Sequence, residues 1–153
     1  MDYDFKKCLK VGQRGEQLIM SALIARGHKI TDLRDDATAR FNDIDLLLDN
    51  GTQQTYLEVK NDMRSETTGN VFVETYNINN INHLCKGWFF YCQANYIAFV
   101  QETKRKAHII SLEELKETIE YKDYREAKTA NSNGYLVPIG DLEKMKSYFL
   151  LEL

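Results

Sequence analysis

The chain has few of the residues that mark the specialised classes of protein. Three of its 153 residues are cysteine and one is proline, and no apolar run approaches the roughly 20 residues of a membrane-spanning helix. Three cysteines without a Cys-x-x-Cys pair do not form a disulfide framework, so we expect free, buried thiols in a reducing compartment. The first residues carry no apolar signal core. These absences favour a globular cytoplasmic protein with no membrane partner.

Positive charge is also scarce. The chain has 20 Lys and Arg against 23 Asp and Glu, a formal net charge of −3. Because non-specific affinity for nucleic acid comes mostly from neutralising phosphates, this balance argues against a strongly basic nucleic-acid binder. A local basic rim can still hold nucleic acid beside an acidic site, although three basic residues in a row usually form a solvated turn. The basic residues that would form such a rim are Arg34, Arg40, Lys60, Arg64 and the tripeptide Lys104-Arg105-Lys106.

The length and the order of patterns predict one α/β domain over residues 1–153. The hydrophobic content of 43% and the charged content of 28% are ordinary for a protein with one sizeable core. A helix is predicted over residues 5–26 and ends at Gly27. Period-two and apolar patterns predict strands at residues 28–33, 40–48, 54–61, 70–76, 95–101 and 107–110.

The rest of the chain gives weaker patterns. Residues 77–93 are ambiguous between a loop and a short helix. Ser111 and Glu114 form a capping box, which predicts a helix to about residue 122. Residues 123–134 are predicted to form a loop. Residues 135–138 are predicted to form an edge strand, because Pro138 does not fit a central strand. A final helix is expected over residues 141–150.

Two neighbouring segments carry the most chemical information. They are Phe41-Asn-Asp-Ile-Asp45-Leu-Leu-Leu48 and Thr55-Tyr-Leu-Glu58-Val-Lys60, separated by the turn-forming Asp49-Asn50-Gly51. Side chains alternate along a strand, so Asp43 and Asp45 should share one face while the intervening apolar residues reach the core. Glu58 and Lys60 share a face by the same rule. A hairpin would therefore gather three carboxylates and one ammonium.

Crowded carboxylates repel one another, and a proton, a lysine or a hard divalent cation relieves the repulsion. Metal-assisted hydrolysis of a phosphodiester uses such a set. Asp45 and Glu58 would hold Mg²⁺ or Mn²⁺, and Lys60 would orient the attacking water or neutralise charge that develops on the phosphate. The plain alternative is a solvated hairpin with a surface Glu/Lys pair.

Asp45 followed by Glu58-Val59-Lys60 resembles the PD-(D/E)XK, or restriction-endonuclease-like, nuclease superfamily. Upstream, Gly12-Gln-Arg-Gly15-Glu16 is similar to the G-x-x-G-E helix of Holliday-junction-resolvase-like and restriction-type members. The resemblance covers about residues 10–62 and implies a mixed β-sheet flanked by helices. It also implies that Glu16 joins Asp45 and Glu58 as a metal ligand. The usual proline before the first acidic residue is absent, which leaves Asp43 as an alternative or accessory ligand.

The local surroundings of Glu16 allow two interpretations. Glu16 lies on the same helical stripe as Ile19, Met20 and Leu23, which should pack on the sheet. A carboxylate there requires a partner or a metal. The alternative is a surface pair between Glu16 and Arg14, in a neighbourhood that Gly15 leaves open.

Two residues in the second half are secondary candidates. Glu74 would be a further acidic member of the site or a partner for Lys60, or else a plain solvent-facing residue. Gly87-Trp88, followed by Ala94-Asn95-Tyr96, is similar to a G-W segment and an A-(D/N)-Y strand of phage-type members. Trp88 would then stack on a base, although an aromatic run is more often core.

The sequence thus predicts a divalent-metal-dependent nuclease, acting on DNA, that cuts with Glu16, Asp45, Glu58 and Lys60. A homodimer is expected because duplex cutting usually needs two sites. One alternative is a non-catalytic nucleic-acid-binding or regulatory module on the same fold; another is an interaction protein whose acidic hairpin keeps a sheet edge soluble. The residues predicted to contact substrate are Arg64, Trp88, Lys104, Arg105 and Lys106.

Overall fold

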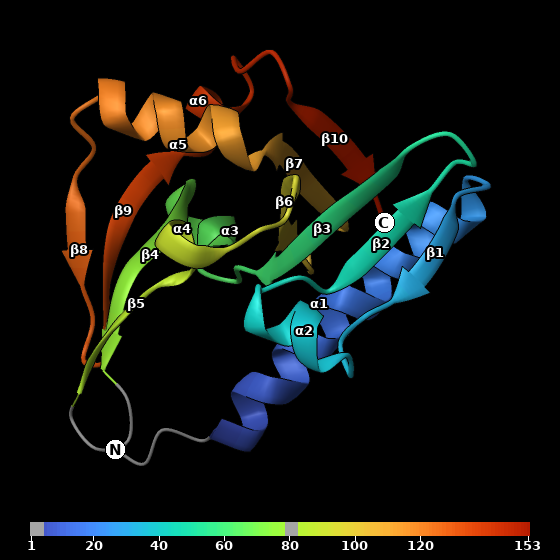
Figure 1. Cartoon of the computed structure of the whole chain (residues 1–153). Coiled ribbons are helices and arrows are strands. Elements are labelled where there is room, and N and C mark those ends of the chain that lie inside the picture. Colours follow the sequence, from blue (N-terminus) through green and yellow to red (C-terminus); the bar gives the residue numbers. More distant parts are fainter. Residues whose placement is uncertain (1–4, 79–82) are drawn as a thin grey trace.

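A computed structural model describes residues 5–78 and 83–153 (Figure 1). Its larger sheet has six strands in the order β1-β2-β3-β6-β7-β10. Strands β3 and β6 run parallel, and the other neighbouring pairs run antiparallel. The strands are β1 (Lys29–Asp32), β2 (Leu46–Asp49), β3 (Gln54–Asn61), β6 (Tyr96–Gln101), β7 (Lys106–Ser111) and β10 (Phe149–Glu152).

A second, antiparallel sheet has four strands in the order β5-β4-β9-β8. These strands are β4 (Asn70–Ile78), β5 (Leu84–Lys86), β8 (Glu126–Lys128) and β9 (Ser132–Pro138). The helices of the described residues are α1 (Phe5–Ala25), α2 (Ala37–Phe41), α3 (Ser65–Thr68), α4 (Trp88–Tyr91), α5 (Leu112–Tyr121) and α6 (Ile139–Leu142).

The six-stranded sheet has a different cover on each face. Helix α1 packs Ile19 and Leu23 against one face, where they meet Leu57 and Val59 of β3. The opposite face packs against the four-stranded sheet, α4, α5 and α6 (Figure 1). Because neighbouring residues of a strand face opposite ways, Glu58 and Lys60 of β3 must point into the layer between the two sheets.

The predicted β2–β3 hairpin is confirmed. Its register pairs Leu46 with Leu57 and Asp49 with Gln54. Gly51 has a φ of +88°, which favours glycine, and its N–H donates to Asp49 Oδ1 at 2.8 Å. The turn therefore fixes which residues of the two strands stand opposite each other.

The predicted strand over residues 40–48 is wrong in its first half. Helix α2 ends there instead, and Asp36 caps it by accepting the Ala39 N–H at 2.8 Å. Asp43 has a φ of +53°, which breaks the alternation of an extended chain. As a result, Ile44 packs in the core between the sheets, whereas Leu46 packs under α1.

Three predictions for the second half are also corrected. The predicted loop over residues 123–134 contains β8, and the predicted edge strand β9 lies between β4 and β8. Pro138 is tolerated because β8 pairs with residues 133–135 and does not reach it. The predicted helix over residues 141–150 is α6 followed by β10, since Leu151 is fully buried when β10 pairs with β7.

The other predicted elements are confirmed with small shifts at their ends. In the ambiguous stretch 77–93, the structure places the end of β4, then β5 and α4; residues 79–82 lie outside the described part. The predicted burial of thiols holds for Cys92, whereas Cys8 is exposed and Cys85 is half-buried. None of the helices in residues 5–78 and 83–153 has the length and apolar character to span a membrane.

Gly15 does not leave an open neighbourhood, as the sequence had indicated. A Cβ at Gly15 would lie 2.8 Å from Asn61 Cβ. Asn61, at the end of β3, donates from Nδ2 to the Val11 carbonyl of α1 at 2.8 Å. Gly15 therefore permits the close approach that anchors α1 over β3.

We expect Gly15→Ala to lower the free energy of unfolding by about 1–3 kcal/mol, because α1 must shift away from Asn61. Gly12→Ala is the matched control, since a Cβ there meets nothing within 4 Å. It should raise stability by about 0.5–1 kcal/mol through helix propensity. Urea unfolding followed by circular dichroism measures both, and equal effects of the two changes would contradict the close-approach interpretation.

Candidate active site

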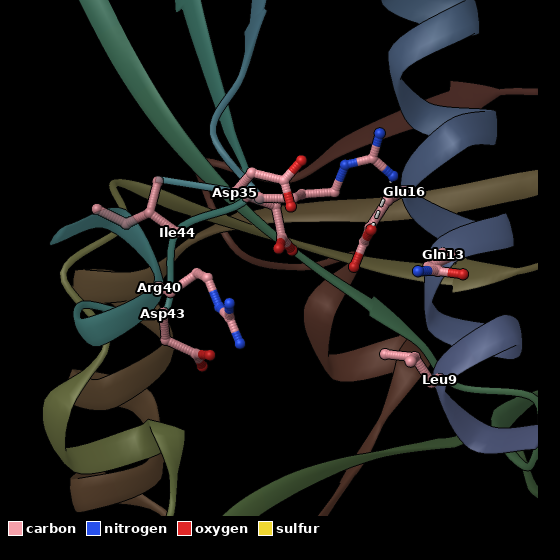
Figure 2. Close-up of a pocket in the computed structure, with 9 residues that line it drawn as sticks. Leu9, Gln13, Glu16, Asp35, Arg40, Asp43 and Ile44 are labelled. Carbon is pink, nitrogen blue, oxygen red and sulfur yellow. Dashed lines mark hydrogen bonds and ion pairs between the residues drawn. The ribbon is translucent and has the colours of Figure 1, made fainter. Parts of the chain in front are cut away.

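A cavity of about 540 Å³ opens between α1, α2 and the segment before β2 (Figure 2). This volume lies within the range of roughly 300–1,000 Å³ typical of ligand pockets. Four of the nine lining residues are acidic and two are arginine, so most of the lining residues are charged. The lining residues are Leu9, Gln13, Glu16, Arg34, Asp35, Arg40, Asp43, Ile44 and Asp45.

Lys60 connects Asp43, on the cavity wall, with Glu58 in the layer between the two sheets. Its Nζ donates to Asp43 Oδ2 at 3.1 Å and to Glu58 Oε1 at 2.5 Å. The same Nζ lies 5.7 Å from the centroid of the Trp88 ring, within range of a cation–π contact. Lys60 thus bridges the carboxylates of Asp43 and Glu58, and its ammonium group lies over the Trp88 ring.

Glu58 is the most deeply buried carboxylate of the site, at 3% exposure. Its Oε1 accepts from Lys60, but its Oε2 is buried without a hydrogen-bond partner in the described protein. Burial raises the pKa of Glu58 well above its usual range; Lys60 opposes this rise, and the charges of Asp45 and Asp43 add to it. A buried oxygen without a partner calls for a proton or a cation.

Asp45 is fixed to β3 although it precedes β2. Its N–H donates to the Leu57 carbonyl at 3.0 Å, and its Oδ2 accepts the Val59 N–H at 2.9 Å. Burial and the charge of Glu16 raise the pKa of Asp45 to about 6, against the Val59 hydrogen bond and Lys60. Asp45 therefore shares one electrostatic environment with Glu16 and Glu58.

Glu16 reaches the cavity from α1 and is held by Arg34. Arg34 Nη1 lies 3.0 Å from Glu16 Oε2, and its Nε donates to Asp32 Oδ1 at 2.8 Å. The predicted alternative, a pair between Glu16 and Arg14, is wrong: Arg14 pairs with Glu102 at 2.8 Å. Glu16 thus belongs to the site, with one oxygen committed to an arginine.

The predicted set of Glu16, Asp45, Glu58 and Lys60 is brought together from α1, β3 and the segment before β2. Asp43 joins it through Lys60. As the side chains stand, no three His, Cys, Asp or Glu residues within 5–78 and 83–153 are arranged to ligate one ion. Arg34 and Lys60 satisfy part of the acidic oxygens instead, so a cation would have to engage the remaining ones.

Glu74 does not pair with Lys60, and Trp88 does not present its ring to the cavity. Glu74 accepts from Asn77 Nδ2 at 3.1 Å and forms no ion pair with Lys60 in the described residues. Trp88 is 5% exposed and packs against Phe99, with ring centroids 6.2 Å apart. A buried ring has no face free for a base, so the predicted stacking role of Trp88 is corrected to one of packing beneath Lys60.

The predicted basic contacts lie outside the cavity. Arg64 is exposed just before α3, on the β3–β4 connection. Lys104 and Arg105 are exposed in the turn between β6 and β7, and Lys106 begins β7. None of the four lines the cavity, so any contact they make with a substrate is peripheral to it.

Sequence reasoning missed the support that the residues directly after α4 give to the acidic segment. Cys92 Sγ donates to the Asp43 carbonyl at 3.2 Å, and the Gln93 N–H donates to the Asn42 carbonyl at 2.9 Å. Nearby, burial and the charge of Asp43 raise the pKa of Tyr91 to about 12. No motif marks these contacts, because they join residues about 50 positions apart.

One comparison with known proteins informs the fold. The structure is similar to the solved structure of the bacterial homing endonuclease I-Ssp6803I, with a TM-score of 0.54. The two chains are 16% identical, and the match covers 88% of this chain and 78% of that one. No protein-family profile and no curated protein sequence matches. The predicted α/β, nuclease-like fold is thereby confirmed; membership of the PD-(D/E)XK superfamily stays a prediction.

We expect the metal-free protein to lose stability as pH rises toward 6. The folded pKa of Asp45, about 6, lies above its ordinary value of 3.8. The folded state therefore holds the extra proton between these values, and stability falls until Asp45 has ionised. Asp45→Asn should raise the free energy of unfolding by about 1–3 kcal/mol near pH 8, with the gain vanishing below about pH 4.

Urea unfolding in a chelator at several pH values measures this. Asp35→Asn is the matched control, because Asp35 is an exposed carboxylate of the same cavity. If Asp45→Asn lowers the free energy of unfolding at every pH, the carboxylate of Asp45 stabilises the fold and the prediction is wrong.

Proposed function

We propose that the protein is a divalent-metal-dependent endonuclease that hydrolyses phosphodiester bonds in DNA. The observation that carries the proposal is the buried Glu58, whose Oε2 has no hydrogen-bond partner in the described residues, beside Asp45 and held by Lys60. The likeness in fold to a homing endonuclease supports it. So does the resemblance of Glu58-Val59-Lys60 to the nuclease motif.

The donor set fits Mg²⁺ or Mn²⁺. Asp45, Glu58 and Glu16 offer carboxylate oxygens, the ligands that hard divalent cations prefer. Burial is the main cause that raises the pKa values of Asp45 and Glu58, so a bound cation would favour their ionised forms. When bound, the cation would polarise the phosphate and lower the pKa of a water. Asp45 and Glu58 are the proposed inner ligands and Glu16 the third.

Lys60 would act as a fixed positive charge. Burial disfavours its charged form, yet the carboxylates of Glu58 and Asp43 outweigh burial and raise its pKa above the usual range. It is therefore protonated at neutral pH and cannot take a proton from water. Its role is to donate hydrogen bonds and to neutralise charge that develops on the phosphate.

Asp43 is proposed to position Lys60 rather than to bind metal. It accepts from Lys60 at 3.1 Å, and its left-handed backbone directs it away from the extended path of β2. Asp45 is the better ligand because its backbone and side chain are both tied to β3. Glu74, which bonds Asn77, has no part in the proposed site.

DNA as the substrate and a homodimer as the active form are further parts of this proposal. Cutting both strands of a duplex would require two copies of this cavity. A second candidate function is a metal-free nucleic-acid-binding module. It is favoured by the pairing of Arg34 with Glu16 and of Lys60 with Glu58, which partly neutralises the carboxylates from within.

We expect cleavage of DNA in Mg²⁺ or Mn²⁺ and none in a chelator. Glu58→Gln and Asp45→Asn should reduce the rate by about a hundredfold or more, and Lys60→Met by a similar factor because a preorganised charge is lost. Asp35→Asn should retain activity. The assay uses supercoiled, linear and single-stranded DNA, with RNA in parallel. A wild-type protein that cleaves none of them in either metal contradicts the nuclease proposal.

Metal binding separates the two candidate functions. For the nuclease, Mg²⁺ or Mn²⁺ should raise the melting temperature of the wild type, since a ligand that binds the folded state stabilises it. The rise should be lost in Glu58→Gln and kept in Asp35→Asn. Differential scanning fluorimetry and calorimetric titration measure this. An equal rise in wild type and Glu58→Gln would place the cation elsewhere, and no binding at all would favour the binding module.

A further inference from the structure

Arg40 differs from the other cations around the acidic site. Figure 2 shows its side chain extending from α2 into the cavity, beside Asp43. Within residues 5–78 and 83–153 its guanidinium forms no ion pair and no side-chain hydrogen bond. Arg34 and Lys60, by contrast, each contact two carboxylates. Arg40 therefore keeps all of its donors available for a ligand.

The position of Arg40 favours an anionic ligand. A guanidinium presents a planar fork of donors that fits phosphate in a bidentate manner. Asp43 and Asp45, on the same wall, are engaged by Lys60 and the Val59 N–H respectively. A phosphate that entered the cavity would consequently find Arg40 free beside the proposed metal ligands.

The next residue supplies an apolar contact. Phe41, at the end of α2, is 82% exposed, and its ring stacks on no other aromatic ring of the described residues. The cation of Arg40 followed by the exposed ring of Phe41 is complementary to a nucleic-acid strand, in which each phosphate adjoins a sugar and a base. Stacking of a base on an aromatic ring tolerates any sequence.

The opposite wall of the cavity is formed by the first turns of α1. Leu9 and Gln13 line it (Figure 2). Lys6 precedes Leu9 by three residues and Gln13 by seven, the spacing of one helix face, and its side chain is exposed. Positive charge thus borders the acidic centre on two sides, from α2 and from α1.

We infer that α2 is a substrate-binding element in which Arg40 binds a backbone phosphate next to the one that is cut. Phe41 packs against the adjoining sugar or base, and Lys6 continues the backbone contact across the cavity. The inference rests on the proposed function, because it assumes that the polyanion entering this cavity is a nucleic acid. It assigns to α2, which the sequence did not predict, the task of holding the strand.

The experiment measures the affinity of the full chain for fluorescently labelled DNA, duplex and single-stranded, by anisotropy in Ca²⁺ over a range of salt. Arg40→Ala should weaken duplex binding about tenfold and reduce the slope of log affinity against log salt by about 0.9, the loss of one phosphate contact. Arg40→Lys should keep the slope, since it keeps the charge. Phe41→Ala should weaken single-strand binding about fivefold or more without changing the slope.

Arg125→Ala is the matched control, an exposed arginine next to β8 and outside the cavity; it should bind like the wild type. Urea unfolding confirms that each variant is folded. If Arg40→Ala keeps the wild-type slope and affinity, the inference is overturned even when the wild type cuts DNA. If the slope falls but the wild type cuts nothing in Mg²⁺ or Mn²⁺, the contact stands and the nuclease proposal fails. Absence of DNA binding by the wild type overturns the inference.

Discussion

The partly buried ion pair between Glu58 and Lys60 is the interaction on which the rest of the site depends. Both residues point from β3 into the layer between the two sheets, where an unpaired charge would be strongly destabilising. Lys60 compensates one oxygen of Glu58 and reaches Asp43 as well. The second oxygen of Glu58 has no hydrogen-bond partner in the described protein. The fold thus maintains a local deficit of positive charge, and that deficit is the physical basis for proposing a cation there.

Rigid backbone surrounds this pair. Val59 and Leu57 of β3 bind Asp45 through main-chain groups. Cys92 and Gln93, directly after α4, donate to the carbonyls of Asp43 and Asn42. Groups that are already held in place reorganise little when a charged ligand binds, and electrostatic catalysis requires such preorganisation. Arg40, which is exposed, lies on the cavity wall where a substrate would enter.

The β2–β3 hairpin illustrates how much of the site could be predicted from local patterns. The turn at Asp49 to Gly51 and the shared face of Glu58 and Lys60 follow from patterns that span only two to four residues of the sequence. The strand over residues 40–48 could not be assigned correctly, because Asp36 caps a short helix that competes with it. Trp88 was ambiguous for a related reason: an aromatic run is more often core but also fits a binding surface, and the burial of Trp88 is decided by its packing with Phe99 and β4.

By itself the sequence determined the helix that carries Glu16, the hairpin that carries Glu58 and Lys60, and the acidic chemistry they share. These depend on periodicity and turn residues within short windows. Tertiary structure alone decided that Arg34 holds Glu16, that Asp43 serves Lys60, and that Arg40 is left free on the cavity wall. Such pairings depend on which of several nearby charges comes within hydrogen-bonding distance. That distance is fixed by the packing of α1, α2 and α4 on the sheet, between segments far apart in the chain.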